Sequence, residues 1–177
     1  GCEDGGLYLV DLKGNGVAKS ISRKIIGRVT SIRILPKGDR IVYGTDKGSC
    51  NIIHLDGSTD EKYILLGHEA LISEIKINEK YNLIVTSSYD GMVRLYDLND
   101  VEDRAIVLTD HQSWVHDLAF TEDFNNVISG GKDNKVFLRP ASTLVAYKAL
   151  MPYVKKGLTT DEWNKWVGKD IPMQSNE

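Results

Sequence analysis

The sequence predicts an all-β protein made of repeated four-stranded units, followed by a short helical tail. The main observation is internal repetition, because the chain matches itself without a gap after a shift of 43 residues. The pairs that carry this period include Asp90 with Asp133, Leu55 with Leu98, and His68 with His111. Repetition at this length is typical of stacked arrays, in which a single repeat cannot bury its own apolar face.

The second observation is that each copy carries strand patterns and turn residues. In the clearest copy, the predicted strands are residues 72–78, 82–88, 92–98 and 104–108. The first of these alternates between polar and apolar residues, and the second is apolar enough for burial on both faces. Asp90 and Gly91 predict a tight turn, since glycine takes positive φ freely and aspartate bonds its own backbone.

The period also predicts the organisation of the chain. Residues 1–12 match only the last third of a copy, so we expect the chain to open partway through a unit. Counting strands in chain order gives two, four, four and three, thirteen in all. The chain is therefore expected to divide into a repeat region, residues 1–140, and a tail, residues 141–177.

Beyond the last repeat, the pattern becomes helical. Apolar residues at helical spacing predict a helix over residues 143–155, which Pro152 ends or kinks. A capping box at residues 159–162 predicts a second helix. Its Trp163 and Trp166 fall on one face, and we expect them to dock on a repeat unit or on a partner.

Four short strands per unit, with Gly-His near the start and Tyr-Asp near the end, resemble the WD40 repeat of β-propellers. The resemblance implies a partial WD40-type β-propeller of about three and a quarter blades of four antiparallel strands, with a short α-helical C-terminal tail. The stretch LTTDEWNKWVGKDIP in the tail resembles the segment that follows WD repeats in some large bacterial signalling proteins. We therefore expect the chain to be the C-terminal part of a bacterial WD-repeat protein.

The resemblance also implies a buried polar network within each blade. Its members are a loop histidine, a hydroxyl residue of the second strand, the turn aspartate and an aromatic residue of the third strand. The expected residues are His68, Ser88 or Thr86, Asp90 and Tyr96 in one blade, and His111, Ser129 and Asp133 in the next. In the preceding blade, Ile25, Lys47 and Ile53 replace the histidine, the aspartate and the aromatic residue, so we expect most of the network to be lost there.

Composition limits the partners and the compartment. The net charge of −3 and the pI of about 5.8 provide no overall basic field, so we expect no nucleic-acid partner. The apolar runs are too short for a membrane span. The two cysteines, Cys2 and Cys50, suggest a reducing compartment, and we expect the protein to be cytoplasmic.

No catalytic, metal or cofactor site is expected, so the chain is predicted not to be an enzyme. His68 and His111 share one repeat position, which favours a structural role for both. Ser113, His116 and Asp117 contain the residue types of a catalytic triad. On a strand, however, His116 and Asp117 point to opposite faces and cannot form a relay.

Partner binding is the favoured function, because three rows of repeat-equivalent positions vary at one end of the blades while the scaffold stays fixed. The rows are Arg28, Leu71 and Trp114; Thr30, Ser73 and His116; and Glu3, Asp46, Tyr89 and Lys132. Arg28, Tyr89 and Trp114 are of the residue types enriched at binding hot spots. The alternative for Trp114 is ordinary packing between blades.

The leading hypothesis is a non-catalytic WD40-type scaffold or sensor that binds a protein or peptide. The alternative is a ligand-binding, sugar-binding or enzymatic propeller with a site at the channel mouth of a composite ring, and a third is a purely structural role in assembly. Propellers usually have four to eight blades, so about three blades leave apolar faces open. We expect a homo-oligomer, a dimer that closes a composite propeller; missing blades or capping by the tail are the alternatives.

Overall fold

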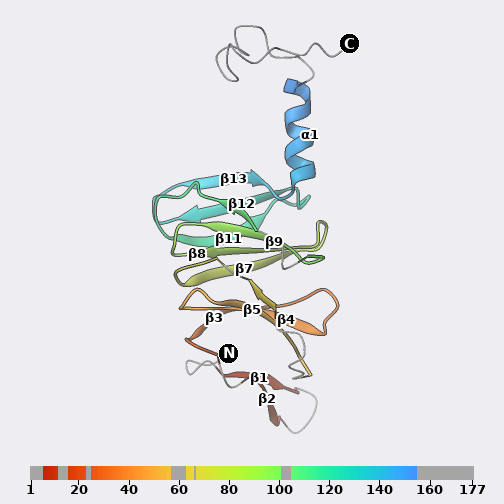
Figure 1. Ribbon diagram of the computed structural model, residues 1–177, viewed down its shortest axis with the longest axis vertical. Helices are drawn as coiled ribbons and strands as arrows, with labels where there is room; N and C mark the ends of the chain where they lie inside the picture. The colour runs from red at the N-terminus through yellow and green to blue at the C-terminus, as the bar shows by residue number, and fades with distance from the viewer. Residues whose placement is uncertain are drawn as a thin grey trace. The chain divides into compact units, whose positions relative to one another are not determined.

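A computed structural model describes residues 6–11, 16–22, 25–56, 63–65, 67–100 and 105–154. This part of the chain contains thirteen strands in four antiparallel sheets of two, four, four and three strands, and one helix (Figure 1). The expected fold class, a partial β-propeller with a short helical tail, is confirmed. The chain forms two compact units, residues 1–141 and 142–177.

Each sheet is a meander in which strands adjacent in sequence pair with one another, and we call the sheets blades 1 to 4. Blade 1 contains β1 (Leu7–Val10) and β2 (Ala18–Ser22). Blade 2 contains β3 (Val29–Ile34), β4 (Arg40–Thr45), β5 (Cys50–His54) and β6 (Tyr63–Leu65). Blade 3 contains β7 (Ile72–Asn78), β8 (Leu83–Ser88), β9 (Val93–Asp97) and β10 (Ile106–Leu108). Blade 4 contains β11 (Val115–Phe120), β12 (Asn126–Gly131) and β13 (Val136–Pro140).

The tight turn between the second and third strands recurs with the period. Its repeat-equivalent residues Gly48, Gly91 and Asn134 have φ values of 80°, 85° and 60°. Glycine adopts this left-handed region without strain, and asparagine tolerates it better than most residues. The turn predicted at Asp90 and Gly91 therefore has the same backbone shape in blades 2, 3 and 4.

The first strand of each of these blades contains a β-bulge that the alternation pattern did not predict. The pairing register shifts between Val29 and Ser31, between Ile72 and Glu74, and between Val115 and Asp117. The bulge adds one residue to the strand and rotates the side chains that follow it. As a result Ile72 and Ile75 are both fully buried, and the simple alternation expected over residues 72–78 is wrong.

The apolar core lies between successive blades. Blade 2 contributes Val42, Cys50 and Ile52, which pack against Ile72, Ile75 and Ile84 of blade 3. Blade 3 contributes Val85, Val93 and Leu95, which pack against Val115, Leu118 and Val127 of blade 4. Leu7 of blade 1 packs against Ile41 and Tyr43 of blade 2. Blades 2 and 3 therefore each bury one face against the blade before and the other against the blade after.

The helix α1 (Thr143–Val154) belongs to the second unit. Ser142 caps its first turn, because the Ser142 hydroxyl accepts a hydrogen bond from the Val145 amide at 3.2 Å. The helix continues through Pro152 and ends two residues later, so the proline does not end it. The second predicted helix, with Trp163 and Trp166, lies outside the described residues. No helix in the described part of the chain is long and apolar enough to cross a membrane.

Candidate functional site

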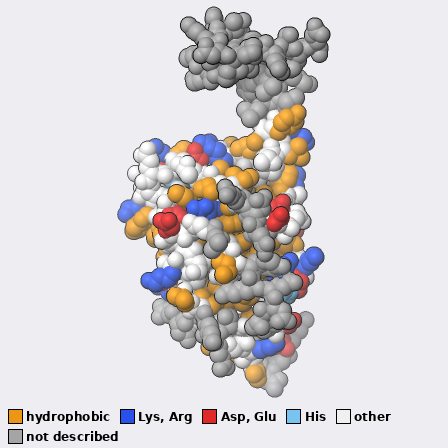
Figure 2. All heavy atoms as spheres, viewed as in Figure 1, with side chains coloured by type: hydrophobic (Ala, Val, Ile, Leu, Met, Phe, Trp, Pro, Cys, Tyr) orange, Lys and Arg blue, Asp and Glu red, His pale blue; other side chains and the backbone are white. Residues whose placement is uncertain are grey.

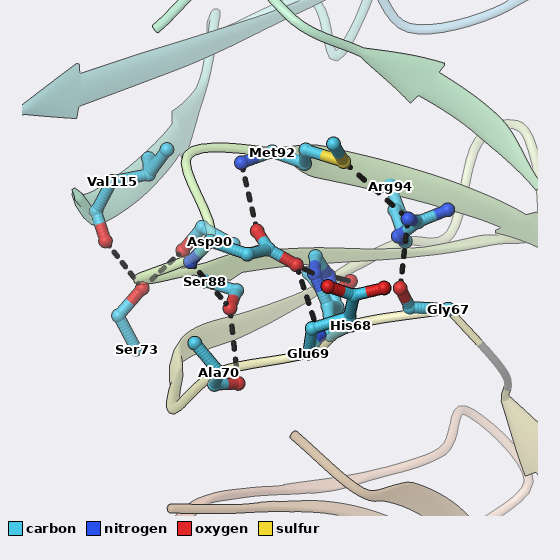
Figure 3. Close-up of polar contacts among 12 residues, drawn as sticks. Gly67, His68, Glu69, Ala70, Ser73, Ser88, Asp90, Met92, Arg94 and Val115 are labelled. Atoms are coloured by element: carbon cyan, nitrogen blue, oxygen red, sulfur yellow. Dashed lines mark hydrogen bonds and ion pairs between the residues drawn. The ribbon is translucent and has the colours of Figure 1, made fainter. Parts of the chain in front are cut away.

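In blade 3, a buried histidine ties the loop before β7 to the turn after β8. His68 Nδ1 lies 2.7 Å from Asp90 Oδ2, and His68 Nε2 lies 2.8 Å from Thr86 Oγ1 (Figure 3). The amides of Glu69 and Met92 also donate hydrogen bonds to the Asp90 carboxylate. This carboxylate therefore joins the loop, the turn and the start of the third strand.

Thr86, rather than Ser88, is the hydroxyl residue that contacts the histidine. Thr86 also shares a hydrogen bond with Tyr96. The Ser88 hydroxyl instead donates to the Ala70 carbonyl at 3.0 Å and accepts from the Asp90 amide at 3.1 Å. Ser88 therefore stabilises the turn backbone, and of the two predicted alternatives Thr86 is the one that contacts His68.

Blade 4 repeats this arrangement one period later. His111 Nδ1 lies 3.0 Å from Asp133 Oδ1, and His111 Nε2 lies 2.9 Å from Ser129 Oγ. Burial alone would raise the pKa of Asp90 and of Asp133, but hydrogen bonds from the histidines and from backbone amides lower both below the usual value. Both carboxylates are therefore ionised at neutral pH.

In blade 2, an apolar cluster replaces the polar network. Ile25, Tyr43 and Ile53 occupy the positions of His68, Thr86 and Tyr96, and they pack together with Leu7 of blade 1. The turn keeps one polar element, because the Thr45 hydroxyl accepts hydrogen bonds from the amides of Lys47 and Ser49. The turn conformation therefore does not depend on the histidine–aspartate pair.

Two of the predicted rows lie side by side at one end of the blades. Backbone hydrogen bonds of 2.8–2.9 Å join the amides of Asp46, Tyr89 and Lys132 to the carbonyls of Arg28, Leu71 and Trp114, respectively. We call the predicted binding residues at this end, Arg28, Asp46, Leu71, Tyr89, Trp114, His116 and Lys132, the interaction edge. Glu3 lies outside the described residues.

An aromatic stack spans blades 3 and 4 within the interaction edge. The rings of Tyr89 and Trp114 are parallel to within 2°, with centroids 4.5 Å apart. The Lys132 ammonium lies over the Trp114 ring at 4.0 Å, and His116 meets Tyr89 edge-on at 5.7 Å. Tyr89 and Lys132 therefore both contact the indole ring of Trp114. Trp114 nevertheless keeps 42% of its surface exposed.

The row formed by the bulge residues behaves differently. The Thr30 hydroxyl donates to the Ile72 carbonyl at 2.6 Å, and the Ser73 hydroxyl donates to the Val115 carbonyl at 2.7 Å. These two bonds join blade 2 to blade 3 and blade 3 to blade 4 at equivalent points. Only His116, the third member of this row, is classed as exposed. Sequence reasoning missed this link, although two hydroxyl residues one period apart were a signal for it.

The remaining members of the interaction edge have simple local roles. Asp46 Oδ1 accepts a hydrogen bond from the Arg28 amide at 2.9 Å, which stabilises the end of blade 2. Leu71 is partly buried and uses its carbonyl to pair with Tyr89. Across the described residues, no group of three or more histidine, cysteine, aspartate or glutamate side chains is placed to hold a metal ion.

Comparison with known proteins found a family match that covers most of blades 3 and 4. The profile of the family described as WD domain, G-beta repeat (WD40) matches residues 59–97 and 103–138. Each matched segment starts at the outer strand of one blade and continues through three strands of the next. No curated protein matches the chain. These two matches support a WD40-repeat family for the blades they cover.

Proposed function

We propose that this chain is a non-catalytic scaffold or sensor module that binds a protein or peptide partner at the interaction edge. WD40 repeats generally act as protein-interaction scaffolds and are typically non-enzymatic. The observation that carries the proposal is the stack of Tyr89 and Trp114, because Trp114 stays 42% exposed at the end of the blades while its ring is stacked on the partly buried Tyr89.

The stack suits binding for a physical reason. Large aromatic side chains contribute wide contact areas and have few rotatable bonds, so little conformational entropy is lost when a partner binds. Tyr89 and Lys132 both contact the Trp114 ring, which restricts its orientation before the partner arrives. Preorganisation of this kind raises affinity without adding contacts.

The charges at the stack favour an acidic partner segment. Lys132 is exposed beside Trp114, and Lys135 follows in the same turn region. On the face drawn in Figure 2, basic and acidic side chains are interspersed rather than gathered in one patch. Because no large field dominates, local cations decide which partner is favoured. We infer that the preferred segment places a carboxylate near Lys132 and an apolar side chain against the edge of Trp114.

The setting of this function is also part of the proposal. The tail resembles segments of large bacterial signalling proteins, which supports a role as the sensor or scaffold part of such a protein. The low cysteine content is compatible with a cytoplasmic location.

A peptide-display selection on the folded chain tests the proposal. Selected peptides should bind the Trp114→Ala and Tyr89→Ala variants at least tenfold more weakly, as hot-spot substitutions do. Phe124→Ala is the matched control, because Phe124 is 41% exposed and lies at the opposite end of β11. Equal binding to all three variants, with folding unchanged, would remove the interaction edge as the binding site.

A further inference from the structure

Blade 2 presents an exposed cation at the turn position where blades 3 and 4 hold a mostly buried acid. Lys47 is exposed, whereas the side chains of its repeat equivalents Asp90 and Asp133 are only 10% and 7% exposed. Each of these aspartates bonds a buried histidine. In blade 2, Ile25 replaces that histidine and offers no hydrogen-bonding side chain, so the side chain at position 47 remains at the surface.

The loop before β3 lies against this turn and adds a second cation, the exposed Arg28. The Asp46 amide donates to the Arg28 carbonyl and Asp46 Oδ1 accepts from the Arg28 amide, both at 2.9 Å. Gly27 has a φ of 97°, and a Cβ added there would lie 2.8 Å from Lys47 Cγ. Because only a residue without a side chain fits at this point, the loop and the turn pack directly on each other.

The same loop exposes an isoleucine where the other blades expose polar residues. Ile26 is 81% exposed, more than any other large apolar residue in the described part of the chain. Its repeat equivalents Glu69 and Gln112 are exposed as well. The exposure therefore belongs to this position in every blade, and what distinguishes blade 2 is the apolar residue type.

We call Ile26, Arg28 and Lys47 the blade 2 anchor. Its two cations exceed the single negative charge of Asp46, whose Oδ1 is already bonded to the Arg28 amide. Arginine offers a carboxylate two parallel donors, and lysine adds a compact point charge. The blade 2 anchor therefore suits an acidic side chain that lies beside an apolar one.

Blade 4 has a similar combination at the other side of the interaction edge. Trp114 is 42% exposed, and the ammonium of the exposed Lys132 lies over its ring. Blade 3, between the two, contributes the partly buried and uncharged Leu71 and Tyr89. The interaction edge therefore has a cationic group on blade 2, an uncharged centre on blade 3 and a cationic group on blade 4.

We propose that the blade 2 anchor binds a second carboxylate of the same partner segment whose first carboxylate lies near Lys132. This inference rests on the proposed function, because it requires the segment to dock at Trp114. Packed sheets lie about 10 Å apart, so blades 2 and 4 are about 20 Å apart. An extended peptide advances about 3.3 Å per residue, so the two acids are about six residues apart. An apolar residue between them contacts Leu71 and Tyr89.

A two-point contact also explains how a small surface binds a short segment. Once one end of the segment is bound at Trp114, the other end reaches the blade 2 anchor in an intramolecular step. The second contact then raises the affinity even where a single exposed charge pair contributes little. The partner that fits is an extended segment with the order acidic, apolar, acidic.

Selection from a library of random twelve-residue peptides displayed on phage tests the proposal, with the full 177-residue chain as the target. The selected peptides should share two acidic positions about six residues apart, with an apolar residue between them. Selected peptides with one acidic position, or with none, would overturn the proposal. The peptide of highest affinity is then synthesised, together with two amide forms in which each acid in turn is replaced by asparagine or glutamine.

Affinities measured by fluorescence anisotropy then assign each acid to a blade. Lys47→Ala should weaken the two-acid peptide about fivefold, as loss of an exposed charge pair does. One amide form should bind wild type and Lys47→Ala equally, and the other should bind wild type and Lys132→Ala equally. Ile26→Ser should weaken the two-acid peptide at least threefold, because apolar contact is lost. Lys37→Ala is the matched control, since Lys37 is exposed in the turn between β3 and β4, at the opposite end of blade 2.

The results distinguish this inference from the proposed function. If Trp114→Ala weakens binding tenfold and Lys47→Ala does not change it, the interaction edge binds the segment without the blade 2 anchor, and only this inference is wrong. If Lys47→Ala weakens the two-acid peptide and both amide forms by the same factor, the lysine meets no carboxylate of the segment, which also overturns the inference. If Trp114→Ala leaves binding unchanged, the proposed function fails and this inference fails with it.

Discussion

Blades 2 and 3 share the same strand order, the same turn conformation and the same bulge, yet their interiors differ in chemistry. Blade 3 joins its loop to its turn through His68, Thr86 and Asp90. Blade 2 fills the same space with apolar packing that includes Ile25 and Tyr43. The comparison teaches that the blade requires a filled interior at these positions rather than one particular set of hydrogen bonds.

The two solutions differ in how they respond to damage. A buried polar network is stable only when every member has a partner, because an unpaired charge or donor in a low-dielectric interior is costly. An apolar cluster loses stability roughly in proportion to the surface removed. Blade 3 should therefore be the more fragile of the two to single polar substitutions, and blade 2 the more tolerant.

The largest effect is expected from Asp90→Ala. The His68 and Asp90 side chains are 1% and 10% exposed, so removing the carboxylate leaves the ring and two backbone amides without their acceptor. The free energy of unfolding should fall by about 3 kcal/mol in a urea titration. Lys47→Ala changes the equivalent position of blade 2 and should stay within about 0.5 kcal/mol. Equal losses in the two variants would erase the contrast between the blades.

A smaller effect is expected at the bulge. Ser73→Ala removes the hydrogen bond from blade 3 to the Val115 carbonyl and should lower the free energy of unfolding by about 1 kcal/mol. His116→Ala changes the same repeat position in blade 4, where the side chain is exposed, and should cost less than about 0.5 kcal/mol. If both variants lost the same stability, the hydroxyl link between blades would contribute nothing measurable.

The smallest effect is a pH dependence that separates the blades. The pKa values of Asp90 and Asp133 lie below those of an unfolded chain, so their stabilisation is present above about pH 4 and is lost as pH falls through the folded-state values. Burial, and then the nearby Cys50, raises the pKa of Tyr43 and of Tyr96 to about 12, so their stabilisation is complete below about pH 10 and is lost as pH rises toward 12.

Thermal unfolding measured across this pH range tests both limits. In the double variant Asp90→Asn, Asp133→Asn, the unfolding temperature should fall less as the pH is lowered below about 4 (the acid limb of the profile). The reason is that, among the described residues, only blades 3 and 4 carry these histidine–aspartate pairs. In Tyr43→Phe, the loss of unfolding temperature above about pH 10 (the alkaline limb) should become smaller, and the loss at acid pH should stay unchanged. An acid limb that persisted in the double variant would assign it to carboxylates outside the network.

Much of the fold was predictable because the repeat imposes the same strands and turns on every copy. The four sheets, their strand numbers and the first tail helix follow the predicted pattern. The bulges were not predictable from the period, since a bulge present in every copy adds no residue to one copy relative to another. Pro152 does not end the helix, because the last turn continues past it to Val154.

The candidate site was predictable only within each blade. Strict alignment on the period pairs Ser129 with Thr86 and not with Ser88, so the hydroxyl partner of His68 was already present in the pattern. The stacking of Tyr89 on Trp114 was not predictable from the repeat period, because it joins two blades. A repeat period assigns positions within a unit but does not give the distance between neighbouring units.

The most direct test of the account is to map where a selected peptide contacts the folded chain, by amide chemical-shift changes on titration. The account predicts the largest changes at Tyr89, Trp114 and Lys132, and none around Phe124 at the other end of β11. Changes centred on the Phe124 loop, or spread along β13, would contradict the claim that the interaction edge is the binding surface.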